Sequence, residues 1–131
     1  AVANLSYVSG LVHSGGHEIV DARPASRFAG EDPEPRPGVE PGHIPGSKNL
    51  PQSALFNADN SWKRGDELRR AFEEAGVDLS RPMVTTCGSG VTAAVLLFGA
   101  HLLGKEDVKL YDGSWSEWGA DPSTPKATGA E

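Results

Sequence analysis

Short apolar runs alternate with amphipathic segments along the chain. Runs rich in aliphatic and β-branched residues predict strands at 18–22, 47–50, 83–86 and 108–111. Apolar residues at helical spacing, closed by glycines, predict helices at 5–14, 25–29, 65–75, 93–103 and within 112–118. Strands that alternate with helices indicate right-handed crossovers. The pattern therefore predicts an α/β fold, with a mainly parallel sheet and helices on both faces.

Composition limits the classes of protein to consider. At 131 residues, with 37% apolar and 23% charged residues, the chain suits one globular domain. A net charge of −6 without basic clusters argues against a nucleic-acid partner. No apolar run reaches the length of a membrane span, and no secretory signal is visible. A single cysteine excludes an internal disulfide, so we expect a reducing, cytoplasmic setting.

Chemically useful residues follow three of the predicted strands. The segment 23–27 comes after the first strand, Cys87 after the third and the segment 112–115 after the fourth. Parallel strands bring their carboxyl ends to one edge of the sheet, where such folds bind ligands. A long loop at 30–45 contains five prolines, which favours an ordered, functional loop. We expect these segments to be neighbours.

Cys87 stands at the centre of this arrangement. It ends a β-favouring run and is followed by Gly88, Ser89 and Gly90, and then by the predicted helix at 93–103. A turn of this kind aims backbone N–H groups and the positive end of a helix at one point, and both favour a thiolate. The alternative is a cysteine that serves as a small buried apolar residue. The pattern favours a nucleophile that receives a small anion.

A thiolate in such a loop suits either phosphoester hydrolysis or sulfur transfer. Cysteine phosphatases place an arginine six positions after the cysteine, and that position is Ala93 here. The phosphatase alternative is therefore weak. His13 and His17 are separated by two glycines and do not form a ligand pair on one helix, so we expect no metal, and no other cofactor is indicated.

Six linked motifs resemble the rhodanese superfamily, specifically the 3-mercaptopyruvate sulfurtransferases. In chain order they are Asp21-Ala-Arg23, Arg27-Phe28, Pro33-Glu-Pro-Arg36, Gly42-His-Ile-Pro-Gly46, the loop Cys87-Gly-Ser-Gly-Val-Thr92 and Asp112-Gly-Ser-Trp-Ser-Glu-Trp118. The resemblance covers roughly residues 5 to 118. It implies a rhodanese-like three-layer fold, with a catalytic domain at 1–118 followed by a polar, mobile tail at 119–131.

The resemblance also implies a reaction. The Cys87 thiolate would take the outer sulfur of 3-mercaptopyruvate, release pyruvate, and pass the sulfur from a persulfide to cyanide, a small thiol or a thioredoxin-like protein. Ser89 would take part in proton transfer, while Arg27 and Arg36 would bind the substrate carboxylate and keto oxygen. Backbone N–H groups of the loop would stabilise the sulfur charge. The other residues of this active-site loop are Gly88, Gly90, Val91 and Thr92.

Two alternatives and one partner accompany this interpretation. Rhodaneses that prefer thiosulfate tend to carry basic residues in the loop, whereas residues 88–92 are uncharged, which favours mercaptopyruvate. Thiosulfate transfer and a non-catalytic module that binds a partner or carries sulfur remain as alternatives. The resemblance is to tandem proteins whose N-terminal rhodanese-like domain works with the loop serine, so we expect this domain alone to be weakly active.

Several other residues of these motifs are expected to have structural rather than catalytic roles. Asp21 and Arg23 are expected to fix the end of the first strand through local hydrogen bonds. His43 is expected to be a satisfied loop histidine, and Trp115 and Trp118 are expected to pack in the core, with Trp115 near the pocket.

Overall fold

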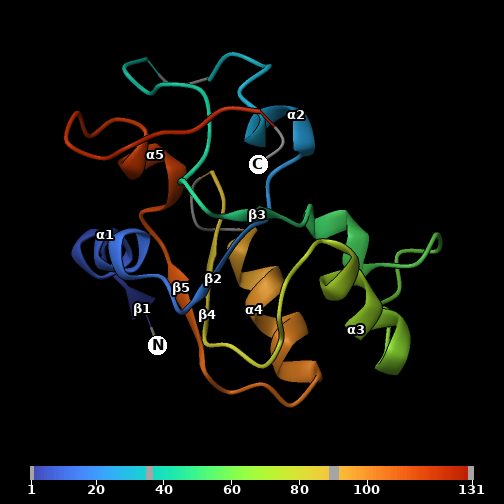
Figure 1. The fold of residues 1–131 in the computed structure, drawn as a ribbon. Helices are drawn as coiled ribbons and strands as arrows, with labels where there is room; N and C mark the ends of the chain where they lie inside the picture. The colour runs from blue at the N-terminus through green and yellow to red at the C-terminus, as the bar shows by residue number, and fades with distance from the viewer. Residues whose placement is uncertain (1, 35–36, 89–91, 130–131) are drawn as a thin grey trace.

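A parallel sheet organises the molecule (Figure 1). The computed structural model describes residues 2–34, 37–88 and 92–129. Within these ranges five strands lie in the order β1-β5-β4-β2-β3, and all neighbouring pairs are parallel. The strands are β1 (Val2–Ala3), β2 (Glu18–Asp21), β3 (Lys48–Asn49), β4 (Met83–Thr86) and β5 (Val108–Tyr111). The helices are α1 (Leu5–Ser14), α2 (Ala25–Phe28), α3 (Gly65–Glu74), α4 (Ala93–Leu102) and α5 (Ser114–Trp118), with a 3-10 turn η1 (Gln52–Leu55).

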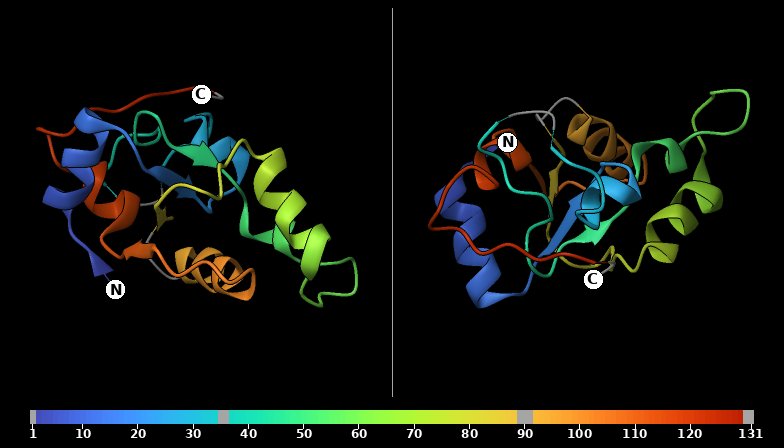
Figure 2. Two further views of the ribbon diagram at one scale, coloured as in Figure 1. Left: turned by 60° about the horizontal axis from the view of Figure 1, so that its bottom comes forward. Right: turned by 90° about the horizontal axis from the view of Figure 1, so that it is seen from above.

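Helices cover both faces of the sheet, as Figure 2 shows. Side chains alternate along each strand, so neighbouring residues of β2 enter different cores: Val20 packs with α3, α4 and η1, and Ile19 packs with α1 and α5. The first core contains Phe72 and Leu96, and the second contains Trp118. The predicted three-layer α/β architecture is confirmed.

The predicted elements match the structure to within a residue or two, except at the N-terminus. The two-residue strand β1 pairs with β5, and its length gives no periodic signal in the sequence. Ser6 is a residue type that often caps a helix, but it lies inside α1. The N-cap is Asn4, whose side chain accepts the hydrogen bond from Tyr7 N at 2.9 Å. None of the helices in the described ranges is long and apolar enough to cross a membrane.

The segment after α5 is held against the body of the molecule. Ala127 and His43 exchange two backbone hydrogen bonds of 2.8 and 3.0 Å, and Gly129 N donates to Ala29 O at 2.9 Å. Gly42 has a φ of +130°, and the carbonyl of Ala127 occupies the space that a Cβ there would need. These contacts do not fit the expected mobile tail at 119–131. The domain boundary at residue 118 stays a prediction.

Candidate active site

A pocket of about 720 Å³ opens at the carboxyl ends of the strands. Its walls come from the segment after β2, the long loop before β3 and the start of η1. Gly88 and Thr92, which precede α4, and Ser116 of α5 complete the lining. The expectation that these segments are neighbours is thus met. The chemically relevant lining residues are Arg23, Arg27, Glu34, Gly88, Thr92 and Ser116.

Cys87 follows β4 directly and is 1% exposed. Helix α5 holds the backbone on both sides of it. Trp115 N donates to Cys87 O at 2.8 Å, and Ser116 N donates to Gly88 O at 2.9 Å. The first turn of α5, whose N–H groups lack partners within the helix, therefore anchors the beginning of the loop that leads to α4. Gly88 carries this anchored backbone into the pocket wall.

Ser114 adds a side-chain contact to this anchor. Its hydroxyl oxygen accepts a hydrogen bond from Cys87 N at 3.0 Å. Its one proton can be donated either to Tyr111 O, at 2.8 Å, or to Cys87 Sγ, at 3.8 Å. The residue is fully buried and has a φ of +52°, a conformation that residues other than glycine rarely adopt. Such strain persists only where surrounding contacts over-determine it, often at functional sites. Ser114 therefore belongs to the cysteine's immediate environment.

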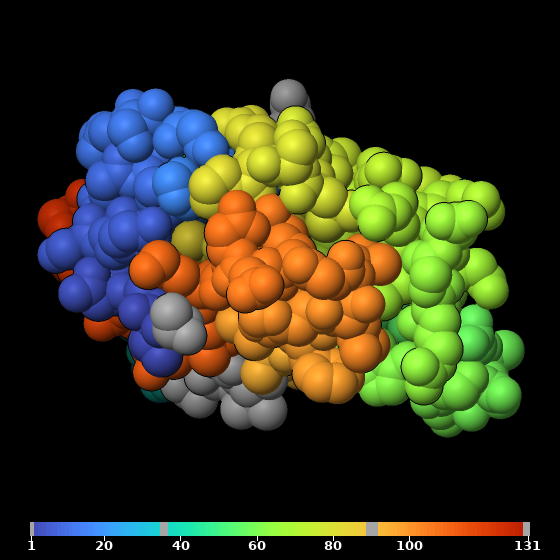
Figure 3. Space-filling view, turned by 90° about the horizontal axis from the view of Figure 1, so that it is seen from below, coloured from blue at the N-terminus to red at the C-terminus, as the bar shows by residue number. Residues whose placement is uncertain are grey.

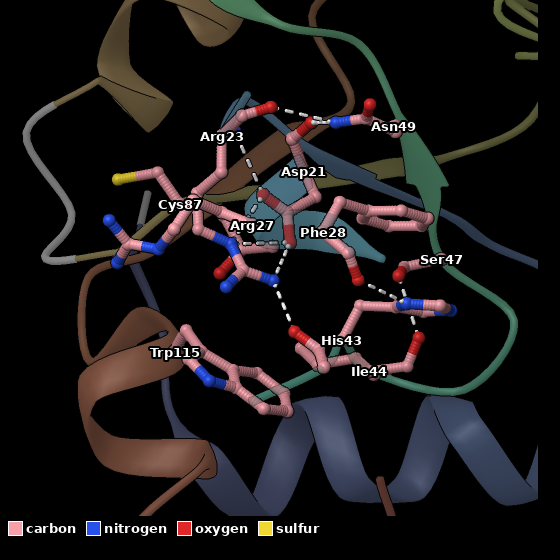
Figure 4. A network of polar contacts seen from close by, with 12 residues as sticks. Asp21, Arg23, Arg27, Phe28, His43, Ile44, Ser47, Asn49, Cys87 and Trp115 are labelled. Carbon is pink, nitrogen blue, oxygen red and sulfur yellow. Dashed lines mark hydrogen bonds and ion pairs between the residues drawn. The ribbon is translucent and has the colours of Figure 1, made fainter. Parts of the chain in front are cut away.

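Asp21 and Arg23 form a buried ion pair at the end of β2. The Asp21 carboxylate accepts bonds from Arg23 N at 2.9 Å and from Nη2 at 2.9 Å, and Nη2 also donates to Gly42 O at 2.7 Å. The guanidinium lies over the ring of Trp115, 5.0 Å from its centroid, as Figure 4 shows. The expected structural role of this pair is confirmed. Arg23 also lines the pocket, in agreement with the expected position of segment 23–27 at the ligand-binding edge of the sheet.

Arg27 projects from α2 into the same pocket, where a carboxylate already meets it. Nη2 of Arg27 donates to Glu34 Oε1 at 3.0 Å, and Nε donates to Oε2 at 3.3 Å. The side chain of Glu34 is only 5% exposed, whereas that of Arg27 is 27% exposed. Nη1 of Arg23 lies 3.6 Å from the same carboxylate and has no hydrogen-bond partner in the part of the chain that the structure describes. Two guanidinium groups and one carboxylate thus form one wall of the pocket.

His43 and Trp115 support this wall from behind. The carbonyl of Phe28 can only accept, so Nδ1 of His43, 2.7 Å away, carries the proton. The His43 ring also stacks on Phe28 with centroids 3.8 Å apart. Trp115 is buried, and its Nε1 donates to Glu40 O at 2.7 Å. Trp115 has the packing role that the sequence predicts. The expected satisfied histidine is only half right, since the buried Nε2 of His43 has no hydrogen-bond partner among the described residues.

Burial shapes the electrostatics of the neighbouring strand end. Tyr111, at the end of β5, is fully buried, and its hydroxyl donates to Glu117 Oε1 at 2.6 Å. Burial, together with the hydrogen bond to this carboxylate and its charge, raises the pKa of Tyr111 far above its ordinary value. The hydroxyl therefore stays protonated over the physiological pH range.

A family model described as a rhodanese-like domain matches residues 4–121. The chain belongs to the rhodanese family. The matched residues include Cys87, the pocket wall of Arg23, Arg27 and Glu34, and the helices next to them. The family assignment agrees with the motifs in the sequence.

Curated relatives of this rhodanese-like domain include sulfurtransferases from animals and plants. The chain is 55% identical over 101 residues to 3-mercaptopyruvate sulfurtransferase of Rattus norvegicus, covering 77% of this chain and 34% of the relative. It is 45% identical over 109 residues to thiosulfate/3-mercaptopyruvate sulfurtransferase 1, mitochondrial, of Arabidopsis thaliana, covering 83% of this chain and 29% of the relative. The chain thus spans about a third of the length of these relatives.

A solved structure also matches the rhodanese-like domain. The crystal structure of SseA from Escherichia coli, a 3-mercaptopyruvate sulfotransferase by its description, superposes with a TM-score of 0.74 at 44% identity. The match covers 89% of this chain and 43% of that chain. The three-layer architecture is therefore shared with a protein of related sequence.

The predicted site residues of the rhodanese-like domain are only partly within the described ranges. Arg27, Gly88 and Thr92 line the pocket, and the buried Cys87 directly precedes Gly88 in the chain. Ser89, Gly90, Val91 and Arg36 lie outside the described residues, so their predicted roles stay predictions. Within the described ranges no group of three or more His, Cys, Asp or Glu residues could hold a metal ion.

Two residues of this site have roles that the sequence does not predict. Glu34 lies within a motif, but no local pattern indicates that its carboxylate turns toward Arg27. Ser114 follows a turn-forming Asp-Gly pair, but nothing in the sequence signals its positive φ or its contact with Cys87.

Proposed function

We propose that this rhodanese-like domain is a sulfurtransferase that accepts the sulfur of 3-mercaptopyruvate on Cys87. The observation that carries the proposal is one pocket whose lining includes both Gly88, from the anchored cysteine loop, and two guanidinium groups. A small anionic thiol fits this combination, because the guanidinium groups can bind its carboxylate while its sulfur meets the cysteine loop. The names of the relatives support the same donor.

The reaction would proceed by attack of the Cys87 thiolate on the sulfur atom of 3-mercaptopyruvate. A sulfur–sulfur bond forms, and the carbon–sulfur bond breaks with its electron pair moving to carbon. The resulting enolate takes a proton at that carbon and leaves as pyruvate. Cys87 is left as a persulfide, which a second thiolate or cyanide then attacks at the outer sulfur. A reducing compartment such as the cytoplasm suits an acceptor that must stay a thiol.

The surroundings of Cys87 support this chemistry. Ser114 and the first turn of α5 fix the backbone before the loop, so that the sulfur does not have to be positioned anew in each reaction. Arg27 is the most exposed cation of the wall and would bind the substrate carboxylate, together with Arg36. Ser89 would move the proton of the substrate thiol.

Mass spectrometry of the intact chain tests the proposal. After incubation with 3-mercaptopyruvate and removal of small molecules, we expect the chain to gain the mass of one sulfur atom, with pyruvate released in equal amount. Cys87→Ser should show neither change, because the hydroxyl is a far weaker nucleophile. Ser116→Ala is the matched control: it removes a hydroxyl that donates to Gly113 O and keeps the backbone N–H that holds Gly88, so this variant should still gain sulfur.

The alternatives give different outcomes in the same experiment. Sulfur gained from thiosulfate but not from 3-mercaptopyruvate would make thiosulfate the donor. No sulfur gained from either donor would favour a non-catalytic module. A partner domain is part of the proposal: we expect turnover to rise when an N-terminal rhodanese-like domain precedes this one in the polypeptide, and equal turnover would remove that partner.

A further inference from the structure

The carboxylate of Glu34 is an unexpected feature of a pocket that is to receive an anion. It lies within the arginine wall, which we define as Arg23, Arg27 and Glu34. Both of its oxygens face Arg27, and Oε2 is also 3.6 Å from Arg23 Nη1. Its side chain is 5% exposed, so water screens its charge poorly. A negative charge therefore sits where an incoming carboxylate would meet Arg27.

The two guanidinium charges of the wall are matched by two carboxylates, Glu34 within the wall and Asp21 beside Arg23. Asp21 pairs with Arg23 at 2.9 Å, and Glu34 pairs with Arg27 at 3.0 Å. The pocket lining also contains Gly88 and Thr92, which carry no charge. The described part of the pocket thus has two guanidinium groups to orient an anion but little net positive charge to attract one. An anion at this wall interacts with Glu34 as well as with the arginines.

We propose that Glu34 determines which sulfur donors the pocket accepts, by favouring a donor with one negative charge over a donor with two. The inference rests on the proposed function. Coulomb repulsion from Glu34 scales with the charge of the ligand, so a dianion such as thiosulfate is repelled twice as strongly as a carboxylate at the same place. The N–H groups of Arg27 and Nη1 of Arg23, which makes no hydrogen bond within the described residues, still orient a single carboxylate.

A purely structural role for Glu34 makes a different prediction. If Glu34 only holds Arg27 in place, its loss would weaken the binding of both kinds of anion to the same extent. If Glu34 sets the pocket charge, its loss would improve the binding of a dianion more than that of a monoanion. The ratio of the two affinities separates these roles, whereas either affinity alone does not.

The experiment uses two unreactive anions, sulfate as the dianion and pyruvate as the monoanion. Their dissociation constants are measured by calorimetry at neutral pH and fixed ionic strength for the wild-type chain and Glu34→Gln. We expect the preference for sulfate over pyruvate to rise roughly tenfold, the size expected for one nearby charge that is partly screened. Glu34→Asp, which keeps the charge, should stay close to the wild-type ratio. Glu34→Ala provides a second neutral variant if Glu34→Gln does not fold.

Glu40→Gln is the matched control. Glu40 is 66% exposed and pairs with Lys126 at 3.5 Å, so this variant changes the net charge equally without touching the wall. It should leave the ratio unchanged. An unchanged ratio in the neutral Glu34 variants, an equal loss for both anions, or no binding of either anion to the wild-type chain would overturn the inference. Because neither anion donates sulfur, a chain that shows the expected ratio but never gains sulfur rejects the proposed function and keeps the charge-selective pocket.

Discussion

Two buried carboxylates stand at opposite ends of β2 and have different environments. Glu18 begins the strand and is 3% exposed, and Asp21 ends it and is 1% exposed. Glu18 binds Lys48 and Arg81, each at 2.9 Å, and Asp21 binds Arg23 at 2.9 Å. At the amino end the cations are 37% and 40% exposed, whereas Arg23 is 3% exposed.

The difference shows how one kind of interaction serves two purposes. Figure 3 shows the amino-end face, where the segments before β4 and β5 pack beside the first residues of the chain. Lys48 and Arg81 reach solvent there and join the segment before β4 to the sheet through Glu18 and Gly76 O. At the carboxyl end the cation is itself buried and fixed in direction, and it forms part of a pocket wall. A buried cation with a fixed geometry is what recognition of an anion requires.

The largest expected effect comes from Asp21→Asn. The substitution keeps the shape of the side chain but leaves the buried guanidinium of Arg23 with only the more distant Glu34, 3.6 Å from Nη1, as a counter-charge. We expect the free energy of unfolding in urea to fall by about 3 kcal/mol, at the lower end of the range for a broken buried pair, because Gly42 O still accepts from Nη2. Glu73→Gln, which removes an exposed carboxylate of α3, should leave the unfolding midpoint nearly unchanged. Equal losses in the two variants would mean that burial of Arg23 does not matter.

Tyr111→Phe gives the next largest effect, and it depends on pH. The pKa of Tyr111 is raised by burial first and by its bond to Glu117 second, so the folded protein keeps the phenol proton when the unfolded chain has lost it. The stability that this provides is complete below about pH 10 and is lost as the pH rises further, by about 1.4 kcal/mol per pH unit. Denaturant unfolding at several alkaline pH values should therefore show a steeper loss for the wild-type chain than for the variant.

Tyr7→Phe is the control for this pH dependence, because Tyr7 is the chain's other tyrosine and lies on α1 with 37% exposure. This variant should keep the steep alkaline loss. Parallel curves for the wild-type chain and Tyr111→Phe would contradict the assignment. The measurement extends the comparison of the two ends of the sheet from β2 to β5. It tests whether stability at the carboxyl edge depends on groups that are shielded from water.

The fold was largely predictable, because it depends on local patterns. Four short apolar runs, closing glycines such as Gly76 and Gly104, and the alternation of strands with helices define a parallel three-layer structure. The strand β1 could not be predicted, because two residues are too few to show a periodic pattern. The contacts of the C-terminal segment could not be predicted either, because they depend on backbone pairing between Ala127 and His43, which composition does not indicate.

The candidate site was predictable only where residue type or motif carries the chemistry. Cys87 and Arg27 could be named, since a lone cysteine before a helix and a basic residue at a strand edge suggest roles by themselves. Ser114 and Glu34 could not, because their roles arise from direction: a positive φ turns one toward Cys87, and the long loop turns the other toward Arg27. Contacts between distant segments appear only after folding.

The smallest expected effect comes from Glu18→Gln, the counterpart of Asp21→Asn. Lys48 and Arg81 can turn to solvent when the carboxylate charge is removed, so neither remains buried without a partner. Lys48 also keeps its bond to Gly76 O at 2.7 Å. We expect a loss of about 1 kcal/mol in the free energy of unfolding and unchanged binding of pyruvate at the far end of the strand. A loss as large as that of Asp21→Asn would show that exposure of the cations does not distinguish the two ends, and weaker pyruvate binding would show that the two ends are coupled through β2.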